Sequence, residues 1–542
     1  MDFIKLAETL YPDVTLTPEQ LEVRYPERNL PEGAKVTRFA PSPTGYVHFG
    51  GLYQALTDER LAHRSGGVFY LRIEDTDAKR EIENGVEGII TSLAKIGIEF
   101  DEGATLDGGK GDYGPYVQSQ RTHIYRVYAK KLVSEGKAYP CFCTPEELTA
   151  IREEQEKIKA DPGYYGKWAV WRDAPVEKVI EQLDKGTPFV LRFRSEGSPE
   201  NKYKFKDLIK GDVEITENDK DHVIMKSDGT PPYAFAHAVD DHLMRTTHVV
   251  RGEEWLPSLP FHIQLFKALG FKLPKYCHTA LILKYDNGNK RKLSKRKDPE
   301  AALDYYVSEG FYPEALLDYV MTLLNSNFEE WRTANPDADY KSFDFSPKKM
   351  SVSGSLFDID KLLDICKNTV SRLSADTVYE KVLAWAEAYD PDFASLLAND
   401  KDYAVKILSI GRGGKKPRKD FALWSEVKSY ISFFYDSLYA PVDSIPDTFD
   451  GDTVAQVLSD FCMSYDEHDE QSVWFDKIKA IAAQNGFCPD MKEYKANPDS
   501  YKGSVADVSM FLRVKITGRL NSPDLYEVMR ILGKERVIAR LS

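Results

Sequence analysis

The feature of this sequence that most constrains its fold is a strand, loop, helix and strand pattern completed in under forty residues. The stretch VTRFA (36–40) predicts a short buried strand, and the turn-rich PSPTG (41–45) follows it. Apolar side chains in residues 50–64 fall near one helical face, and two glycines then end the helix. The stretch VFYLRI (68–73) predicts a second strand. Two strands joined through a helix form a βαβ unit, which requires a parallel sheet.

The loop PSPTGYVHFGG (41–51) lies where such sheets bind ligands, between the end of a strand and the start of a helix. Its small residues let the backbone approach a phosphate closely, and a helix N-terminus attracts anions. His48 immediately precedes the helix, so its side chain can donate a hydrogen bond to phosphate. By itself, a histidine in this position is more often a helix cap or a surface group.

Strand-like patterns return later in the chain, after a segment of different character. Residues 121–211 contain helices rich in Lys and Glu and one extended stretch, PFVLRFR (188–194). Apolar strand patterns then recur at HVIMKSDG (222–229), THVVRG (247–252) and TALIL (279–283). We interpret this as one nucleotide-binding sheet interrupted by an inserted domain, followed by an almost entirely helical final part.

The overall charge of −14 argues at first against a nucleic-acid partner. Phosphate binding, however, requires only local basic patches. Two are present, KRKLSKRK (290–297) and RGGKKPRK (412–419), although an ordinary solvated charge run is the alternative for each. Six scattered cysteines form no disulfide framework and fit a reducing cytosol. No apolar run approaches the ~20 residues that span a bilayer, and the N-terminal residues have neither the basic region nor the long apolar region of a secretory signal, so we expect a cytoplasmic protein without a membrane partner.

Within the first basic patch, KLSKR (292–296) places Lys292 and Lys295 in a loop after the last strand, where they can act as mobile charges on a polyphosphate. In this order, the 41–51 loop and KLSKR resemble the HIGH and KMSKS signatures of class I aminoacyl-tRNA synthetases. From about residue 34 to the end, the chain resembles bacterial-type glutamyl-tRNA synthetases in RFAPSPTG, RIEDTD (72–77), GPYVQSQR (114–121), AVDDHLM (238–244), RGEEWLPS (251–258) and ITGRLNSPDLYEVMRILGKER (516–536).

The resemblance implies an α/β fold: a Rossmann-like parallel-sheet catalytic domain with an inserted α+β acceptor-binding domain, followed by all-α anticodon-binding domains. The expected division is an N-terminal extension (1–33), the first half of the catalytic domain (34–120), the inserted tRNA acceptor-binding domain (121–211), the second half with the KLSKR loop (212–300), a helical stem-contact domain (301–375) and a helical anticodon-binding domain (376–542).

The resemblance also implies the reaction. Glutamate is activated by ATP, with Mg²⁺ bridging phosphates, and is then transferred to the terminal adenosine of tRNA(Glu). No covalent enzyme intermediate is needed, so catalysis rests on positioning and on stabilising negative charge. His48, Lys292 and Lys295 are the expected catalytic residues. The expected ATP-binding positions are these three together with Gly50, Gly51, Glu254 and Trp255.

Glutamate selectivity requires an arginine, because a guanidinium only donates hydrogen bonds and pairs poorly with an amide NH₂. Arg38 and Arg251 match the family positions that bind the side-chain carboxylate. Glu74 matches the acceptor for the ammonium group, and Ser42 and Tyr233 match supporting hydrogen-bonding positions.

The chain departs from the family pattern in three places. Gly51 replaces the second histidine of HIGH, a variant common in glutamyl enzymes, and His237 stands where relatives vary and receives no role. Cys141 and Cys143 match half of a zinc site found in some members. The other half is Tyr164 to Trp168, where a tryptophan replaces the last ligand, so we expect no zinc and no other bound metal site.

Several alternatives remain open at this point. A non-discriminating enzyme that also glutamylates tRNA(Gln) would have the same active site, and a catalytically inactive tRNA-binding paralogue would keep the fold. A glutaminyl-tRNA synthetase is disfavoured, because that family resembles PPEPNG rather than PSPTG and carries a β-barrel where this chain is helical. We expect a monomer that takes ATP, L-glutamate and tRNA as substrates.

Overall fold

The computed structural model describes residues 2–77 and 80–542, so Met1 of the predicted extension lies outside the described residues. The chain divides into two compact units. The first runs from the N-terminus to Val307 and includes Leu317–Asp358, and the second consists of Ser308–Leu316 and Ile359–Ser542. The finer six-part division expected from the sequence stays a prediction.

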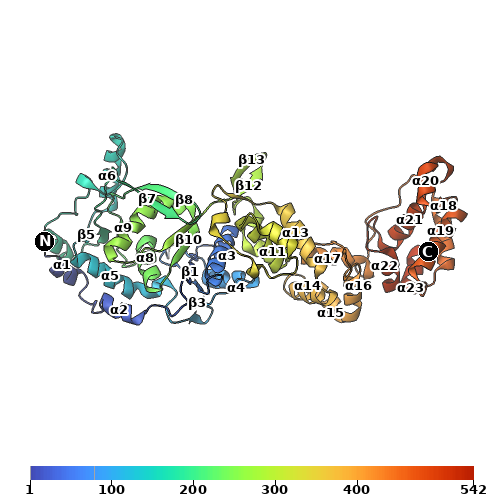
Figure 1. The fold of residues 1–542 in the computed structure, drawn as a ribbon, viewed down its shortest axis with the longest axis horizontal. Helices are drawn as coiled ribbons and strands as arrows, with labels where there is room; N and C mark the ends of the chain where they lie inside the picture. The colour runs from blue at the N-terminus through green and yellow to red at the C-terminus, as the bar shows by residue number, and fades with distance from the viewer. Residues whose placement is uncertain (1, 78–79) are drawn as a thin grey trace. The chain divides into compact units, whose positions relative to one another are not determined.

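The core of the first unit is a sheet with the strand order β1-β2-β3-β4. Figure 1 labels β1 and β3 of this sheet. Its strands are β1 (Val36–Phe39), β2 (Val68–Leu71), β3 (Glu102–Thr105) and β4 (Gly108–Lys110). β1 and β2 are parallel, and helix α3 (Phe49–His63) connects them. The predicted βαβ unit is confirmed, and the 41–51 loop lies at its β1–α3 junction.

A second parallel pair lies beside β1. β10 (His248–Gly252) pairs with β11 (Lys275–Thr279). The Thr247 N–H donates to the Val36 carbonyl at 2.9 Å, and the Val36 N–H donates to the Thr247 hydroxyl at 2.8 Å. The Val36 N–H therefore does not bond to the backbone of the segment that enters β10, and the usual ladder between β1 and β10 is not formed. The expected single sheet consists of two hydrogen-bonded groups of strands, with β1 and β10 as the neighbouring edges.

The intervening region builds its own antiparallel sheet, in the order β5-β6-β9. The elements of this region are β5 (Ala138–Cys141), α6 (Pro145–Lys157), α7 (Val176–Asp184), β6 (Val190–Phe193), the separate hairpin of β7 (Lys202–Asp207) and β8 (Gly211–Thr216), and β9 (Val223–Met225). The expectation that residues 222–229 return to the nucleotide-binding sheet is wrong, because β9 pairs with β6. An apolar pattern predicts a strand but does not specify its partner.

The expected strand TALIL (279–283) is divided between two strands. β11 ends at Thr279, and β12 (Ile282–Asp286) begins three residues later, pairing with β13 (Asn289–Lys292) and β14 (Ser355–Leu356). Between them, the Leu281 N–H donates to the Glu253 carboxylate at 3.3 Å instead of to a neighbouring strand.

The N-terminal segment forms α1 (Phe3–Leu10) and α2 (Pro18–Arg24), which pack against α5 (Thr122–Ser134). Its anchors are buried Leu6, Leu21 and Tyr25. Arg28 donates two hydrogen bonds to Glu102, at 2.8 and 3.0 Å. The segment is therefore an ordered part of the first unit.

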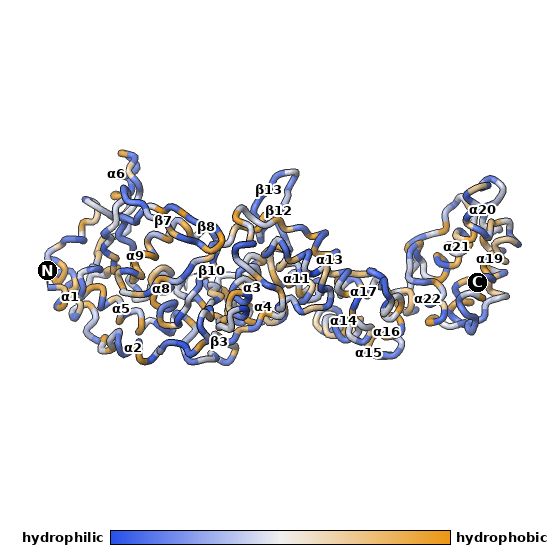
Figure 2. The backbone as a smooth tube through the Cα atoms, viewed as in Figure 1, coloured by the Kyte–Doolittle hydropathy of each residue, from blue (hydrophilic) through white to orange (hydrophobic). Residues whose placement is uncertain are grey.

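Helices make up most of the remaining chain. The first unit contains α4 (Gly85–Lys95), α8 (Tyr233–Leu243), α9 (Leu259–Leu269) and α12 (Phe328–Ala334). The helices α10 (Leu303–Glu309) and α11 (Pro313–Leu324) each have residues in both units. The second unit contains α13 (Ile359–Arg372), α14 (Ala375–Tyr389), α15 (Pro391–Asn399), α16 (Lys401–Ser409), α17 (Trp424–Ile431), α18 (Gly451–Ser464), α19 (Gln471–Gln484), α20 (Met491–Ala496), α21 (Val505–Thr517), α22 (Leu525–Leu532) and α23 (Lys534–Leu541). Polar and apolar residues alternate along the traced chain (Figure 2), and among the described helices we find none with the length and apolarity of a membrane span.

Candidate active site

The predicted glutamate-site residues line one cavity of about 600 Å³ at the C-terminal ends of β1 and β10. Its walls include Arg38, Ser42, Glu74, Tyr233 and Arg251, together with His48, Gly51 and Trp255. A smaller adjoining cavity of about 260 Å³ shares His48 and Gly51 and is also lined by Gly50, Glu254 and Lys292. The structure thus brings the residues predicted to bind glutamate and ATP together around His48.

His48 caps the N-terminus of α3, and its protonation can be deduced from its contacts. The Gly50 N–H donates to Nδ1 at 2.9 Å, so Nδ1 carries no proton and a neutral ring has its proton on Nε2. Burial, reinforced by the charges of Lys295 and Lys292, lowers the pKa of His48 to about 4. At neutral pH the imidazole is therefore uncharged and offers a single N–H donor.

The two glycines after His48 permit close packing at the start of this helix. A β-carbon on Gly51 would lie 3.2 Å from Val47 and 3.3 Å from Phe39, and one on Gly50 would lie 3.2 Å from His48 Nδ1. Such distances are shorter than comfortable carbon contacts. The absence of side chains keeps the helix N-terminus close to β1 and places the backbone of Gly50 and Gly51 in the wall of the smaller cavity.

The KLSKR loop is held near the same helix. Lys295 donates through Nζ to the Tyr46 carbonyl, and Lys292 lines the smaller cavity. Asp298 is the anchor of the loop, because it accepts from both terminal nitrogens of Arg291, at 2.6 and 2.8 Å, and from the Ser294 N–H at 2.9 Å. Arg291 thus shapes the loop, whereas Lys292 and Lys295 remain exposed.

A buried network of charged groups forms one side of the larger cavity. Arg38 donates to Asp241 at 3.3 Å and to the Val250 carbonyl at 3.2 Å. Arg72 joins Asp241, at 2.6 Å, to Glu74, at 2.9 Å. Burial would raise the pKa of Asp241, but Arg38 and Arg72 outweigh it and hold that pKa well below its usual value. Burial also raises the pKa of Glu74, and the nearby arginines limit the rise.

Arg251 has different surroundings. Its guanidinium donates from Nε to His278 Nε2 at 3.0 Å and from Nη1 to His262 Nδ1 at 3.2 Å. The third nitrogen, Nη2, has no hydrogen-bond partner in the part of the chain that the structure describes. A buried arginine whose partners are imidazoles keeps an uncompensated positive charge, which favours an anionic ligand.

The balance of charge around the cavity points the same way. The Asp, Glu, Lys and Arg residues that line it are Arg38, Arg80, Lys226 and Arg251 on the positive side and Glu74 and Asp77 on the negative side. This positive excess suits an amino acid carrying two carboxylates and one ammonium group.

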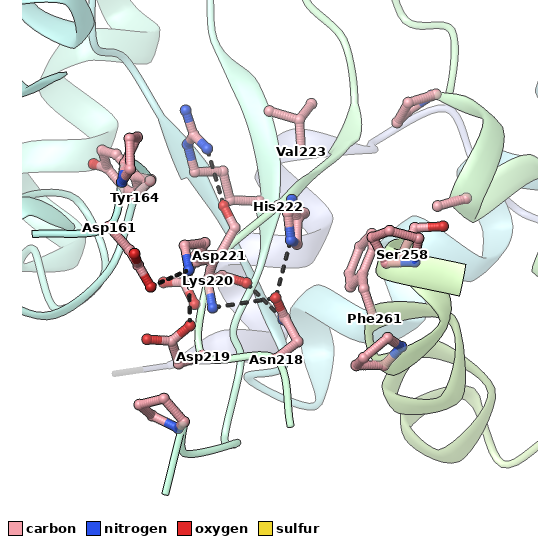
Figure 3. A pocket seen from close by; sticks show the side chains of 18 of the residues that line it. Asp161, Tyr164, Asn218, Asp219, Lys220, Asp221, His222, Val223, Ser258 and Phe261 are labelled. Atoms are coloured by element: carbon pink, nitrogen blue, oxygen red, sulfur yellow. Dashed lines mark hydrogen bonds and ion pairs between the residues drawn. The ribbon is translucent and has the colours of Figure 1, made fainter. Parts of the chain in front are cut away.

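A third cavity, of about 1000 Å³, adjoins the first and shares Tyr233 and Trp255 with it. The two rings lie 4.4 Å apart between centroids and separate the cavities. Figure 3 shows the polar side of the third cavity, where His222 Nε2 lies 3.0 Å from Asn218 Oδ1 and Lys220 lies near Asp161 and Asp219. Phe261 and Ser258 face them from the segment that begins α9.

Several residues of the site were missed by the sequence analysis. Arg72, Asp240 and Asp241 organise the charged network, and His262 and His278 hold Arg251. The only available signal was the placement of the first three inside RIEDTD and AVDDHLM, stretches that the resemblance had already marked.

The Cys141–Cys143 pair lies in a crowded cluster in the inserted region. Cys143 Sγ lies 3.5 Å from the Tyr164 hydroxyl, which accepts from the Trp171 N–H at 3.1 Å. The Arg192 guanidinium carbon lies 4.0 Å from the centre of the Tyr164 ring. Two thiols and a phenol beside a fixed positive charge are a poor donor set for Zn²⁺, which takes four Cys, His or carboxylate ligands in structural sites.

Freshly purified, untagged protein is therefore expected to contain far less than one equivalent of zinc per chain. Elemental analysis by mass spectrometry would measure it, and a Cys143→Ser variant supplies the matched control, with an unchanged metal content expected. Zinc near one equivalent that disappears in Cys143→Ser would contradict the prediction.

A parallel-sheet domain with an inserted region and two loops suited to phosphate is the catalytic architecture of class I aminoacyl-tRNA synthetases. Accordingly, residues 35–363 match the family model described as the catalytic domain of class I tRNA synthetases (E and Q), and residues 495–542 match an anticodon binding domain. A glutamate–tRNA ligase from Acetivibrio thermocellus is 52% identical to the chain, over 100% of the chain and 99% of the ligase. One from Clostridium beijerinckii is 47% identical, over 99% of the chain and 98% of the ligase. A crystal structure of a glutamate–tRNA ligase from Elizabethkingia meningosepticum, in complex with its amino acid, matches with a TM-score of 0.74 at 29% identity, covering 94% of this chain and 98% of that one. The chain belongs to the glutamate–tRNA ligase family.

Proposed function

We propose that this glutamate–tRNA ligase activates L-glutamate with ATP in the 600 Å³ cavity and transfers it to tRNA(Glu) at the adjoining cavity. The observation that carries the assignment of the cavity is its pairing of opposite charges: Arg251 has a guanidinium nitrogen without a partner among the described residues, and Glu74 is a carboxylate in the same wall. Glutamate presents a carboxylate to the first and an ammonium group to the second, with Arg38, Ser42 and Tyr233 supporting it.

The proposed activation step is attack of the glutamate α-carboxylate on the α-phosphate of ATP, with release of pyrophosphate. The His48 Nε2–H donates to phosphate, while Lys292 and Lys295 stabilise the charge that develops on the departing group. Gly50, Gly51, Glu254 and Trp255 surround the nucleotide. Mg²⁺ bound to the ATP phosphates would neutralise further charge there.

In the second step, a ribose hydroxyl of the terminal tRNA adenosine attacks the adenylate carbonyl, and AMP leaves. The 1000 Å³ cavity is the proposed position of the tRNA 3′ end, because it opens beside Tyr233 and Trp255. An inactive paralogue is disfavoured by the presence of every residue that these two steps use. The scattered free cysteines support a cytoplasmic location.

The proposal is tested by charging purified tRNA(Glu) and tRNA(Gln) side by side with labelled glutamate. Charging of tRNA(Glu) is the expected result. Charging of both identifies a non-discriminating enzyme, and charging of neither, with correctly folded protein, would overturn the proposal.

The basic segment 412–419 is the proposed tRNA contact in the second unit. Arg412 is occupied structurally, donating to the Val370 carbonyl at 2.6 Å, and Arg418 pairs with Asp420 at 2.9 Å. The lysines Lys415, Lys416 and Lys419 are exposed and available to phosphates.

Replacing these three lysines with glutamate should weaken tRNA binding and flatten its salt dependence, by roughly 0.7 to 0.9 in the log–log slope for each phosphate that is no longer neutralised. Binding titrations over a range of salt concentrations measure both. The rate of adenylate formation at saturating tRNA should not change. The control variant Lys381→Glu, which changes an exposed lysine on α14, should alter neither the tRNA affinity nor its salt dependence. An equal affinity and slope in the triple variant would favour a solvated surface that does not touch tRNA.

A further inference from the structure

The side chain of Arg251 is held by two buried histidines, one of which is bound in turn by a carboxylate. Buried arginines commonly face carboxylates, as Arg38 faces Asp241 here. Arg251 instead faces His278 and His262, and the three side chains are at most 4% exposed. The nearest negative charge along this chain of contacts is Asp207, on the far side of His278.

The contacts determine the protonation of both histidines. A guanidinium only donates hydrogen bonds, so His278 Nε2 and His262 Nδ1 must both be acceptors without protons. His278 then carries its proton on Nδ1 and donates it to Asp207 Oδ2 at 2.8 Å. The opposite tautomer would place two N–H groups against each other between His278 and Arg251.

Asp207 is fixed in turn by backbone donors. Its Oδ1 accepts from the N–H groups of Ile209 and Lys210, at 2.9 and 2.8 Å, and its Oδ2 accepts from the His278 N–H at 3.1 Å. Burial would raise the pKa of Asp207, but its hydrogen bonds with His278 and these backbone groups outweigh that effect and lower it. The complete set of four hydrogen bonds requires a carboxylate, since an amide would turn its NH₂ group toward two of the donors.

We propose that Asp207 and His278 are positioning residues that set the preference for glutamate, a role that rests on the proposed binding of the ligand carboxylate by Arg251. Asp207 orients His278, and His278 fixes the plane of the guanidinium through Nε. Because the negative charge is held one imidazole away, Arg251 Nη2, which has no partner among the described residues, stays available to the ligand. A carboxylate in direct contact would compete with the ligand and reduce the advantage of glutamate over glutamine.

Asp207→Asn tests this arrangement. The amide should disturb the His278 tautomer, and the KM for glutamate should rise about 10-fold to 100-fold, by analogy with the loss seen when the hydrogen-bond partner of a metal-binding residue is removed. The KM for ATP should not change, and the preference for glutamate over glutamine should fall. Pyrophosphate exchange at saturating tRNA(Glu) measures all three quantities. Asp207→Glu, which keeps a carboxylate, should recover part of the loss.

A merely structural role would lower the active fraction and leave the glutamate KM and selectivity unchanged, which would overturn the proposal. His248→Gln is the matched control, because His248 is buried on the same strand as Arg251 and contacts Thr247 instead. It should leave glutamate KM unchanged.

If thermal unfolding reveals that Asp207→Asn does not fold, His278→Gln decides the matter. The glutamine oxygen can accept from Arg251 but does not receive its orientation from Asp207, so an intermediate rise in glutamate KM is expected and an unchanged value contradicts the proposal. The variant Arg251→Gln distinguishes a failure of the positioning role from a failure of the proposed glutamate pocket. If it impairs glutamate use and the Asp207 and His278 variants do not, only the positioning role fails. If all of these variants behave as the parent, the proposed glutamate pocket fails as well.

Discussion

Replacement of Lys295 with alanine is expected to slow adenylate formation by about 100-fold or more. The Lys295 ammonium is held beside the loop that precedes α3, where it donates to the Tyr46 carbonyl and contributes to lowering the pKa of His48. Loss of one preorganised charge at a site of developing negative charge typically costs about 10²–10³ in rate. Glutamate affinity should change little, because Lys295 is not part of the wall around Arg251 and Glu74.

Single-turnover measurement of adenylate formation, with tRNA(Glu) present, separates this step from tRNA charging. Lys297→Ala is the matched control, since Lys297 is an exposed lysine two residues away in the same loop, and a rate close to that of the parent is expected. A parental rate in Lys295→Ala would remove the KLSKR loop from the proposed mechanism.

The parts of the fold that could be predicted from the sequence depend on local patterns. The β1–α3–β2 unit follows from two short strand-like stretches, a turn-rich loop and a pair of helix-ending glycines, all close in sequence. The position of the 41–51 loop then follows from the geometry of parallel sheets. The resemblance added the identities of the expected site residues, which line the 600 and 260 Å³ cavities, apart from Lys295, which contacts the loop around them.

The parts that could not be predicted depend on contacts between distant segments. β9 pairs with β6, which lies about thirty residues earlier in the chain, and no pattern in residues 222–229 specifies that partner. Asp207 and His278 are separated by 71 residues, and each alone resembles an ordinary buried polar group. Their proposed role can be recognised only from the folded structure, in which His278 contacts both Arg251 and Asp207.

The second large effect is expected from Arg251→Gln. Glutamine at this position removes the positive charge and leaves the ligand carboxylate in a buried pocket without its main partner. Breaking a buried charge pair costs about 2–5 kcal/mol, which corresponds to roughly 30-fold to 4,000-fold in kcat/KM for glutamate at about 1.4 kcal/mol per factor of ten. Use of ATP should be nearly unaffected.

The direction of the change in selectivity makes this prediction specific to the pocket. The introduced side-chain amide can both donate to and accept from a ligand amide, so the variant should lose much more activity toward glutamate than toward glutamine, and their ratio should fall. Arg38→Gln should act in the same direction, since Arg38 lines the same cavity. Arg64→Gln removes an exposed arginine paired with Asp344 and controls for the loss of a positive charge elsewhere in the first unit. Pyrophosphate exchange with each amino acid, at saturating ATP and tRNA(Glu), gives the ratio directly. Normal glutamate kinetics in both Arg251→Gln and Arg38→Gln would mean that the amino acid binds elsewhere.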